Sequence, residues 1–401
     1  MSGGRPGAAV TAPLSLGVVG LGRAFMLMRA TFLLDERVRL TAAADPRPAA
    51  RDAFVAEFGG RAHDTAEALV NDPDVEAVYI ATPHQFHEPQ VLLALAARKP
   101  VLVEKPMALD LASARRMADA AERAGLPLIV GHSHSFDAPY LLARSLIGTP
   151  GVGRLHSITA LNFTDYLYRP RRPEELDTAQ GGGVVFGQAP HQVEVVRLLG
   201  GGRVRSVRAM TARPDAKRPT EGIYAAFLTF EDGGFATLTY SGMGHFDSDS
   251  WMGWGGELGQ AKDPDAHGSA RAALARFATP GAEAAFKETR TYGAAPLPAP
   301  EPPRRHNHFG PVIAACDHAD LLPDPLGVAV HADAERRHVA TPLRAAPRAE
   351  VVDELLAVLR DGRAPLHSAR WSVATMEVVL GILASAAEGR EVRMTEQLGL
   401  P

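Results

Sequence analysis

Apolar residues in the first third of the chain occur in short unbroken runs that alternate with stretches of helical periodicity. The runs lie at 16–19, 38–44, 75–81, 101–103 and 126–130. Helical stretches are expected at 26–34, 65–71 and 111–124, the last with capping residue types at Asp110 and Gly125. Short continuous apolar runs are typical of buried parallel strands. Their alternation with helices predicts a doubly wound parallel sheet.

Beyond residue 150 the strand-like runs lengthen and lose the helices between them. They lie at 155–163, 204–212, 223–230 and 235–241, with a Glu-Asp-Gly-Gly hairpin turn at 231–234. Adjacent strands without crossovers predict an antiparallel sheet. One helix is expected at 190–199, further strands at 312–316 and 327–332, and final helices at 348–360 and 368–387. Residues 244–305 have little periodicity and are expected to form a long excursion.

The predicted fold class is α/β, with an N-terminal doubly wound parallel sheet followed by an α+β domain whose sheet is open and mostly antiparallel. We expect a flexible leader at 1–13, the first domain at 14–136 and the second at 137–401. A chain of 401 residues is long enough for two domains that each bury a core.

Composition narrows the class of protein without naming a function. Apolar residues make up 46% and charged residues 22%, and the net charge of −4 gives no field that would attract nucleic acid or an anionic membrane. The single cysteine, Cys316, excludes an internal disulfide and a cysteine-built zinc site, and it suits a reducing cytoplasm. No apolar run is expected to span a bilayer.

A glycine-rich turn stands between the first strand and the first helix. Gly20 and Gly22 permit a tight turn and close approach of a pyrophosphate to a helix N-terminus, although Phe25 replaces the third glycine of this fingerprint. Asp45 ends the second strand, at the spacing expected for a carboxylate that accepts bonds from an adenosine ribose. This carboxylate repels a 2′-phosphate, which Arg47 offsets only in part. The predicted cofactor is NAD, with NADP as the alternative.

Three further motifs follow in order: Thr82-Pro83-x-x-x-His87, Glu104-Lys105-Pro106, and Gly181-Gly182-Gly183 with His191-x-x-Glu194. With the glycine-rich turn they resemble the glucose–fructose oxidoreductase / inositol dehydrogenase (GFO/IDH/MocA) family along nearly the whole chain. The resemblance implies a Rossmann domain, an open-sheet domain and NAD(P) in the cleft between them. It also implies that Lys105 lies beside the nicotinamide and that His191 faces the substrate. The expected cofactor-binding residues are Gly20, Gly22, Arg23, Ala24, Phe25, Asp45, Arg47, Thr82, Pro83, His84, His87, Glu104 and Lys105.

The chemistry of hydride transfer agrees with this assignment. Removal of hydride from an alcohol carbon requires a group that takes the hydroxyl proton. Lys105, partly desolvated beside a cationic ring, has its pKa lowered and can serve as that group. Gly187 stands where the family usually has an aspartate, four residues before His191. Gln188, water or His134 could substitute, and His191 could instead be a structural residue near a helix N-terminus.

Histidine pairs at His84-x-x-His87, His132-x-His134 and His306-x-His308 raise the alternative of a metal site. Such sites need carboxylates from further strand ends, and the first pair belongs to the cofactor motif. We therefore expect no metal.

Residues 162–177 and 250–256 resemble the phthalate 4,5-cis-dihydrodiol dehydrogenase branch of the family. Arginines near tyrosines suit a planar ring that carries carboxylates. The expected substrate-binding residues are His134, Tyr166, Tyr168, Arg169, Arg171, Arg172 and Gln188. Alternatives are a sugar or cyclitol dehydrogenase and a non-catalytic NAD-sensing regulator. The expected partners are a small-molecule substrate and further copies of the chain, joined through the C-terminal sheet.

Overall fold

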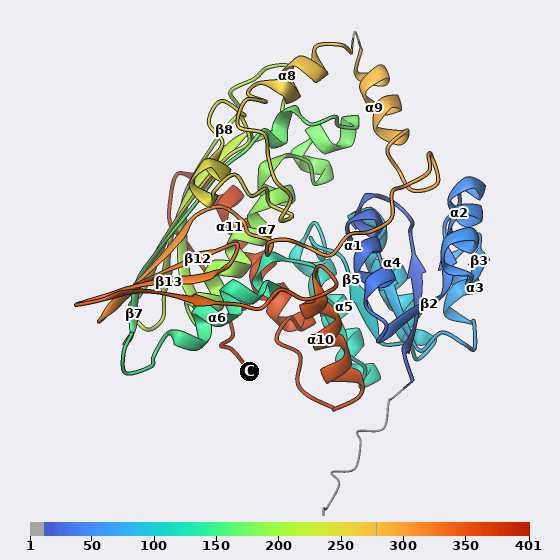
Figure 1. Cartoon of the computed structure of the whole chain (residues 1–401), viewed down its shortest axis with the longest axis horizontal. Coiled ribbons are helices and arrows are strands. Elements are labelled where there is room, and N and C mark those ends of the chain that lie inside the picture. The colour runs from blue at the N-terminus through green and yellow to red at the C-terminus, as the bar shows by residue number, and fades with distance from the viewer. Residues whose placement is uncertain (1–11, 278) are drawn as a thin grey trace, which may run out of the picture.

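The computed structural model describes residues 12–277 and 279–401, so most of the predicted leader at 1–13 lies outside the described residues. The first sheet is entirely parallel, with strand order β3-β2-β1-β4-β5-β6 (Figure 1). Its strands are β1 (Leu14–Val19), β2 (Val38–Ala44), β3 (Arg61–His63), β4 (Ala77–Ile80), β5 (Val101–Val103) and β6 (Leu128–Val130). The predicted doubly wound parallel sheet is confirmed.

Helices follow the strands of this sheet as the alternation predicts. They are α1 (Arg23–Leu34), α2 (Pro48–Phe58), α3 (Ala66–Val70), α4 (His87–Ala96) and α5 (Leu111–Ala124). The Asp110 carboxylate accepts from the Ser113 amide and Gly125 adopts the left-handed conformation, so both ends of α5 are capped as predicted. Helix α2 was not predicted. Its Pro48 stands at the first helical position, where no amide donor is needed, and prolines here are equally typical of a turn.

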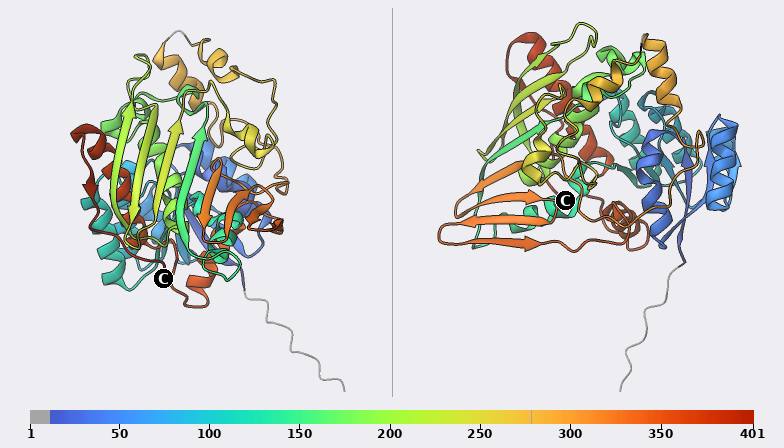
Figure 2. Two further views of the ribbon diagram at one scale, coloured as in Figure 1. Left: turned by 90° about the vertical axis from the view of Figure 1, so that its left-hand side faces the viewer. Right: turned by 45° about the horizontal axis from the view of Figure 1, so that its top comes forward.

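The second sheet has nine strands in the order β14-β13-β12-β11-β7-β10-β9-β8-β15, mostly antiparallel as predicted (Figure 2). The exception is the parallel pair of β7 and β10. Strands β12, β14 and β15 were not predicted. The strands are β7 (Leu155–Phe163), β8 (Val204–Ala212), β9 (Ile223–Phe230), β10 (Phe235–Ser241), β11 (Val312–Cys316), β12 (Ala319–Asp324), β13 (Gly327–Ala332), β14 (Arg336–Ala340) and β15 (Val392–Arg393).

Helices α6 (Ala138–Leu146) and α7 (Gly183–Leu199) cover the face of this sheet that is turned toward the first domain (Figure 1). The predicted start of α7 at residue 190 is wrong, because the helix begins at Gly183 and contains Pro190 in its interior. A proline normally marks the first turn of a helix, since it lacks an amide hydrogen and crowds the carbonyl four residues earlier. His191 therefore lies in the middle of a buried helix rather than at its N-terminus.

The two C-terminal helices join the domains. Helix α10 (Ala349–Leu359) places Val351, Val352 and Leu355 in the same apolar core as β1 and α1. Helix α11 (Ala369–Glu388) packs against β8, α7 and α5. By length and composition alone α11 could span a bilayer, contrary to the expectation from the sequence, but 67% of its most apolar window is buried within the protein. It is a core helix of this fold.

The excursion at 244–305 crosses from the second domain to the first. It contains the short helices α8 (Ser269–Leu274) and α9 (Pro280–Glu288), then descends over α1 (Figures 1 and 2). There the Tyr292 ring meets Phe25 edge-on with centroids 4.9 Å apart, and the Tyr292 hydroxyl donates to Glu57. The excursion therefore covers the edge of the first domain where β1 and β2 end.

Candidate active site

The turn after β1 has the geometry of a dinucleotide-binding loop. Gly20 has φ +91°, and a Cβ there would lie 2.7 Å from a Thr82 methyl carbon, so only glycine fits. A Cβ at Gly22 would meet open space, and within the described chain no side chain caps the N-terminus of α1. Free amides at a helix N-terminus bind anions. Ala24 follows in the first turn of α1, beside the exposed Arg23. These residues fit a pyrophosphate.

Phe25 does not contribute its side chain to this loop. The ring is fully buried between Phe58 and Tyr292. The expectation that Phe25 binds the cofactor is therefore corrected to its backbone alone, because a buried ring cannot contact a ligand outside the core.

Asp45 lies at the end of β2 as predicted, but its carboxylate already has partners. Its Oδ2 accepts from the Leu21 amide at 2.8 Å, and the Arg47 guanidinium contacts both oxygens, at 3.0 and 3.1 Å. Arg47 also donates to the Thr291 hydroxyl and the Tyr292 carbonyl of the excursion. A ribose that uses Asp45 must therefore displace Arg47 from the carboxylate.

The loop after β4 is fixed by a buried histidine. His87 lies with one ring nitrogen 3.0 Å from the Thr82 carbonyl and the other 3.0 Å from the Pro106 carbonyl. Burial lowers the pKa of His87 to about 4, so the ring is neutral near pH 7. His87 thus holds the Thr82-Pro83 loop against the Lys105 loop and does not itself face a ligand. His84 crosses to the second domain, 3.0 Å from the Gln180 carbonyl.

Lys105 stands at the end of β5, at the junction of the two domains. Its Nζ donates to the Gly187 carbonyl at 3.1 Å, and the Lys105–Pro106 peptide is cis. Glu104 is turned into the first domain, where it accepts from the Tyr79 hydroxyl. Burial lowers the pKa of Lys105, which favours the neutral amine that a proton acceptor must be.

Two other residues of α7, the helix that Lys105 contacts through the Gly187 carbonyl, were also predicted for the site. His191 is 5% exposed, its Nδ1 has no hydrogen-bond partner among the described residues, and burial holds its pKa well below the ordinary value. Gln188 is buried, and its Oε1 accepts from the Tyr240 hydroxyl at 3.2 Å. The alternative that Gln188 replaces the missing aspartate is not supported, because its carbonyl oxygen is engaged elsewhere.

The space of the family's aspartate is filled by Tyr166. A Cβ at Gly187 would lie 2.0 Å from the Tyr166 Oη. The Tyr166 ring in turn lies under the Arg171 guanidinium, 3.7 Å from it. Glycine at 187 is therefore the partner of a tyrosine at 166.

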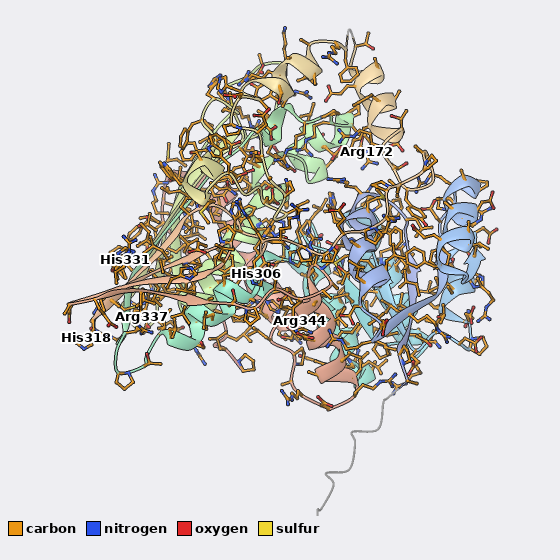
Figure 3. All side chains as sticks on the ribbon, viewed as in Figure 1. Arg172, His306, His318, His331, Arg337 and Arg344 are labelled. Carbon is orange, nitrogen blue, oxygen red and sulfur yellow. The ribbon has the colours of Figure 1, made fainter. Side chains whose placement is uncertain are left out.

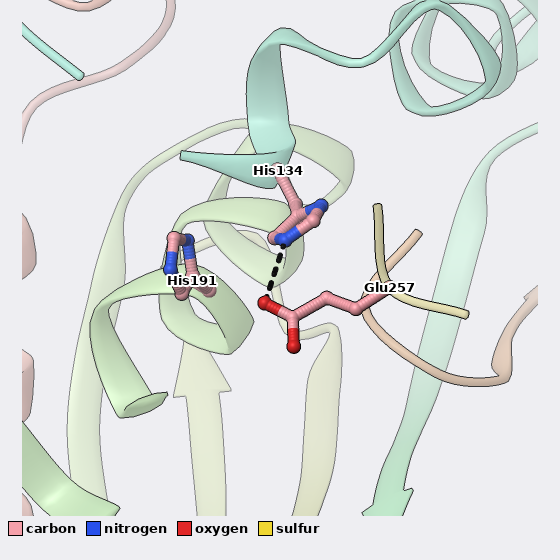
Figure 4. Close-up of side chains that lie close together, drawn as sticks. All are labelled: His134, His191 and Glu257. Carbon is pink, nitrogen blue, oxygen red and sulfur yellow. Dashed lines mark ion pairs between the residues drawn. The ribbon is translucent and has the colours of Figure 1, made fainter. Parts of the chain in front are cut away.

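His134 joins the site from the turn after β6. Its Nδ1 lies 2.6 Å from Asp137 Oδ2, and its Nε2 lies 3.5 Å from Glu257 Oε1 (Figure 4). Burial opposes the charged form of His134, but Asp137 and Glu257 outweigh it and raise the pKa of His134. The centroids of His134 and His191 are 4.8 Å apart. Glu257 was not predicted, since it lies in the excursion, where no periodicity singles it out.

The predicted substrate arginines differ in position. Arg169 pairs with Asp165 at 2.8 Å and lies 4.0 Å from Glu257, which places it at the rim of the site. Arg171 donates to the Tyr166 carbonyl and lies 3.5 Å from Glu175. Arg172 pairs with Glu174 and Glu288, beside α9 (Figure 3). Arg169 alone of the three approaches Glu257.

The side chains of the remaining candidates have partners of their own. The Tyr168 hydroxyl donates to Asp215 and its ring stacks on Arg271, so the expectation that Tyr168 binds the substrate is not supported. His306 lies 3.2 Å from the Thr341 carbonyl, and His308 lies 2.8 Å from the Gly255 carbonyl. The rings of His306 and His308 thus each contact a backbone carbonyl, and the His308 backbone amide donates to the Glu257 carbonyl at 3.2 Å.

Comparison with known proteins agrees with this architecture. Residues 14–132 match the model of an oxidoreductase family with an NAD-binding Rossmann fold, and residues 140–261 match the GFO/IDH/MocA C-terminal domain. The fold and site thus define an NAD-binding oxidoreductase, a dehydrogenase of two domains. The chain belongs to the GFO/IDH/MocA family.

Three relatives illustrate the range of this family. A 1-carboxy-3-chloro-3,4-dihydroxycyclohexa-1,5-diene dehydrogenase of Comamonas testosteroni is 45% identical over 92% of this chain and 94% of its own length. An inositol 2-dehydrogenase of Streptomyces avermitilis is 33% identical over 57% of this chain and 68% of its own. A solved protein of Bordetella bronchiseptica RB50 superposes with a TM-score of 0.90 and 40% identity, over 95% of this chain and 100% of that protein.

Proposed function

We propose that the protein oxidises a ring-borne cis-diol that carries carboxylate, with NAD as the hydride acceptor. The 45% identity to the Comamonas dehydrogenase along nearly the full length of both chains carries this proposal. The substrate predicted from the sequence, 4,5-dihydro-4,5-dihydroxyphthalate, belongs to the same chemical class. Because another relative is an inositol 2-dehydrogenase, a cyclitol is the second candidate substrate.

The residues at the domain junction support a mechanism in which the cofactor and Lys105 accept the hydride and the proton, respectively. NAD, when bound, would supply the acceptor for the hydride of one carbinol carbon. Lys105, whose amine is 3.1 Å from the Gly187 carbonyl and whose pKa is lowered by burial, accepts the proton of the same hydroxyl. The C–H and O–H bonds break and a C=O bond forms. The resulting hydroxyketone enolises to a catechol, so aromatisation favours oxidation.

Arg169 is the proposed partner of the substrate carboxylate. Its side chain is 44% exposed and approaches Glu257 at the rim of the site, where a substrate carboxylate would compete with Asp165 at 2.8 Å. Arg172 instead lies beside α9, paired with Glu174 and Glu288. A bidentate guanidinium–carboxylate contact is worth about 2–3 kcal/mol, which corresponds to roughly 30- to 150-fold in kcat/KM.

The test is NADH formation with the phthalate diol, a monocarboxylated dihydrodiol, an uncarboxylated dihydrodiol and myo-inositol. We expect the carboxylated diols to have the highest kcat/KM, and Arg169→Ala to lower it for them alone. Arg172→Ala is the matched control and should leave the ranking unchanged. Equal use of carboxylated and uncarboxylated diols, or a preference for myo-inositol, would replace the proposed substrate class.

We also propose that the protein is a cytoplasmic homo-oligomer assembled through the open face of the second sheet. In the left view of Figure 2 no described helix covers this face. It exposes Met210, Phe227, Phe235 and Ile313, and the Phe227 and Phe235 rings stack 5.5 Å apart. Exposed apolar patches of this kind mark association surfaces. Light scattering of wild type and Phe227→Glu tests this, and a wild-type monomer would contradict it.

A further inference from the structure

Three residues that are far apart in sequence present ligand atoms to one another in the active site. His134 comes from the turn after β6, His191 from α7 and Glu257 from the excursion (Figure 4). Their ligand atoms all lie within 4.8 Å of one another. Ligands about 2.0–2.2 Å from a tetrahedral zinc ion lie about 3.4 Å apart. His134 and Glu257, at 3.5 Å, are already at that separation.

The surroundings of His134 have the form of a metal-binding histidine. Its Nδ1 is 2.6 Å from Asp137, which leaves Nε2 directed at Glu257. Histidine ligands usually donate their second ring nitrogen to a carboxylate in this way. Asp137 is itself buried and held by His132 at 3.1 Å and by Asn307 at 3.4 Å. Hydrogen bonds therefore fix both His134 and the carboxylate that orients it.

The position of His191 favours a bound metal cation over a proton on His134 as the positive charge of this cluster. A protonated His134 between Asp137 and Glu257 would balance those two carboxylates, but it would give no role to the His191 imidazole, whose buried Nδ1 has no partner among the described residues. Buried polar atoms are nearly always paired. A divalent cation would bind one ligand atom from each of the three residues at once.

We propose that His134, His191 and Glu257 form a divalent-cation site, best matched by Zn²⁺, that holds the hydroxyl groups of the substrate. Two imidazoles and one carboxylate suit zinc, and three protein ligands leave a position open, as in catalytic sites. This inference rests on the proposed function, because a cis-diol can chelate a cation through both oxygens. The cation keeps its charge throughout: the hydride goes to NAD and the hydroxyl proton to Lys105.

This site would also account for the glycine at 187. A cation bound to the hydroxyl oxygen lowers the pKa of that hydroxyl. The reaction then no longer needs an aspartate beside Lys105 and His191, and Tyr166 is free to fill its place.

The experiment is titration of chelator-treated, purified protein with Zn²⁺ against a chromophoric chelator, in the absence of substrate. We expect one equivalent to bind to wild type, and at least 100-fold weaker binding by Glu257→Gln and His134→Ala. His318→Ala removes a histidine whose side chain is 57% exposed on the far end of the second sheet, and it should bind like wild type (Figure 3).

Thermal unfolding separates loss of the site from loss of the fold. Zn²⁺ should raise the Tm of wild type and of His318→Ala but not that of the nearly isosteric Glu257→Gln, while all three have similar Tm values without metal. Absence of stoichiometric binding, or wild-type binding by Glu257→Gln, would overturn the proposal. Full turnover by enzyme verified to be metal-free would also overturn it. Glu257-dependent binding without oxidation of any diol would support the cation site and contradict the proposed function.

Discussion

For an alanine substitution at Gly187, helix propensity predicts a gain in the free energy of unfolding, whereas packing predicts a loss. Gly187 lies inside α7, where replacement of glycine by alanine should stabilise the helix by about 1 kcal/mol. The new Cβ, however, would lie 2.0 Å from the Tyr166 Oη, well inside the ordinary contact distance of 3.4 Å. Overpacking of a filled site costs about 1–3 kcal/mol and here the obstructing group is a ring held by Arg171. We therefore expect Gly187→Ala to lower the free energy of unfolding, by up to about 2 kcal/mol.

The effect of Gly187→Ala on the free energy of unfolding should reverse when the Tyr166 side chain is removed. In a Tyr166→Ala background the same substitution should stabilise by about 1 kcal/mol, which gives a coupling energy of about 1–3 kcal/mol between the two positions. Gly281→Ala in α9 is the control, since among the described residues its Cβ would meet only the Thr279 Oγ1, at 3.9 Å, and it should stabilise in either background.

The assay is urea unfolding of the four proteins of the cycle, with m-values compared to confirm that each unfolds as one unit. Gly187→Asp, which introduces the residue usual in the family, should be at least as destabilising as Gly187→Ala. If Gly187→Ala stabilises the protein with Tyr166 present, the tyrosine does not occupy this space and the explanation of the missing aspartate fails.

Three further predictions follow from single residues. Lys105→Met should keep NAD affinity and lose about 10²- to 10⁴-fold in kcat. The kcat of the wild type should rise with pH and level off below the ordinary lysine pKa of 10.5, because burial lowers the pKa of Lys105. NAD should give a higher kcat/KM than NADP, and Arg47→Ala, which removes the cation paired with Asp45, should widen that ratio; a narrower ratio would contradict the assignment. Burial raises the pKa of Glu350 to about 7, so its contribution to stability is lost as pH rises from about 4.5 through 7. Glu350→Gln should therefore be more stable than wild type by about 1–2 kcal/mol at pH 8, and nearly equal to it at pH 4.5, in paired urea unfolding curves.

The sequence alone determined the features that depend on neighbouring residues. The glycine turn at Gly20, the capped helix from Asp110 to Gly125 and the position of Lys105 at a strand end were all predicted, because each follows from local backbone geometry and from the burial of short apolar runs. The order of family motifs then predicted the two-domain dehydrogenase fold.

Contacts between distant segments were decided only by the tertiary structure. Glu257 has no pattern around it, and it became a neighbour of His134 only because the excursion folds back over the site. Tyr166 entered the space beside Gly187, and Arg47 took the Asp45 carboxylate, through packing between elements far apart in the chain. Periodicity reports which face of an element is buried, but it carries no information on which distant side chain will meet that face. The composition of the active site therefore depended on the assembled fold.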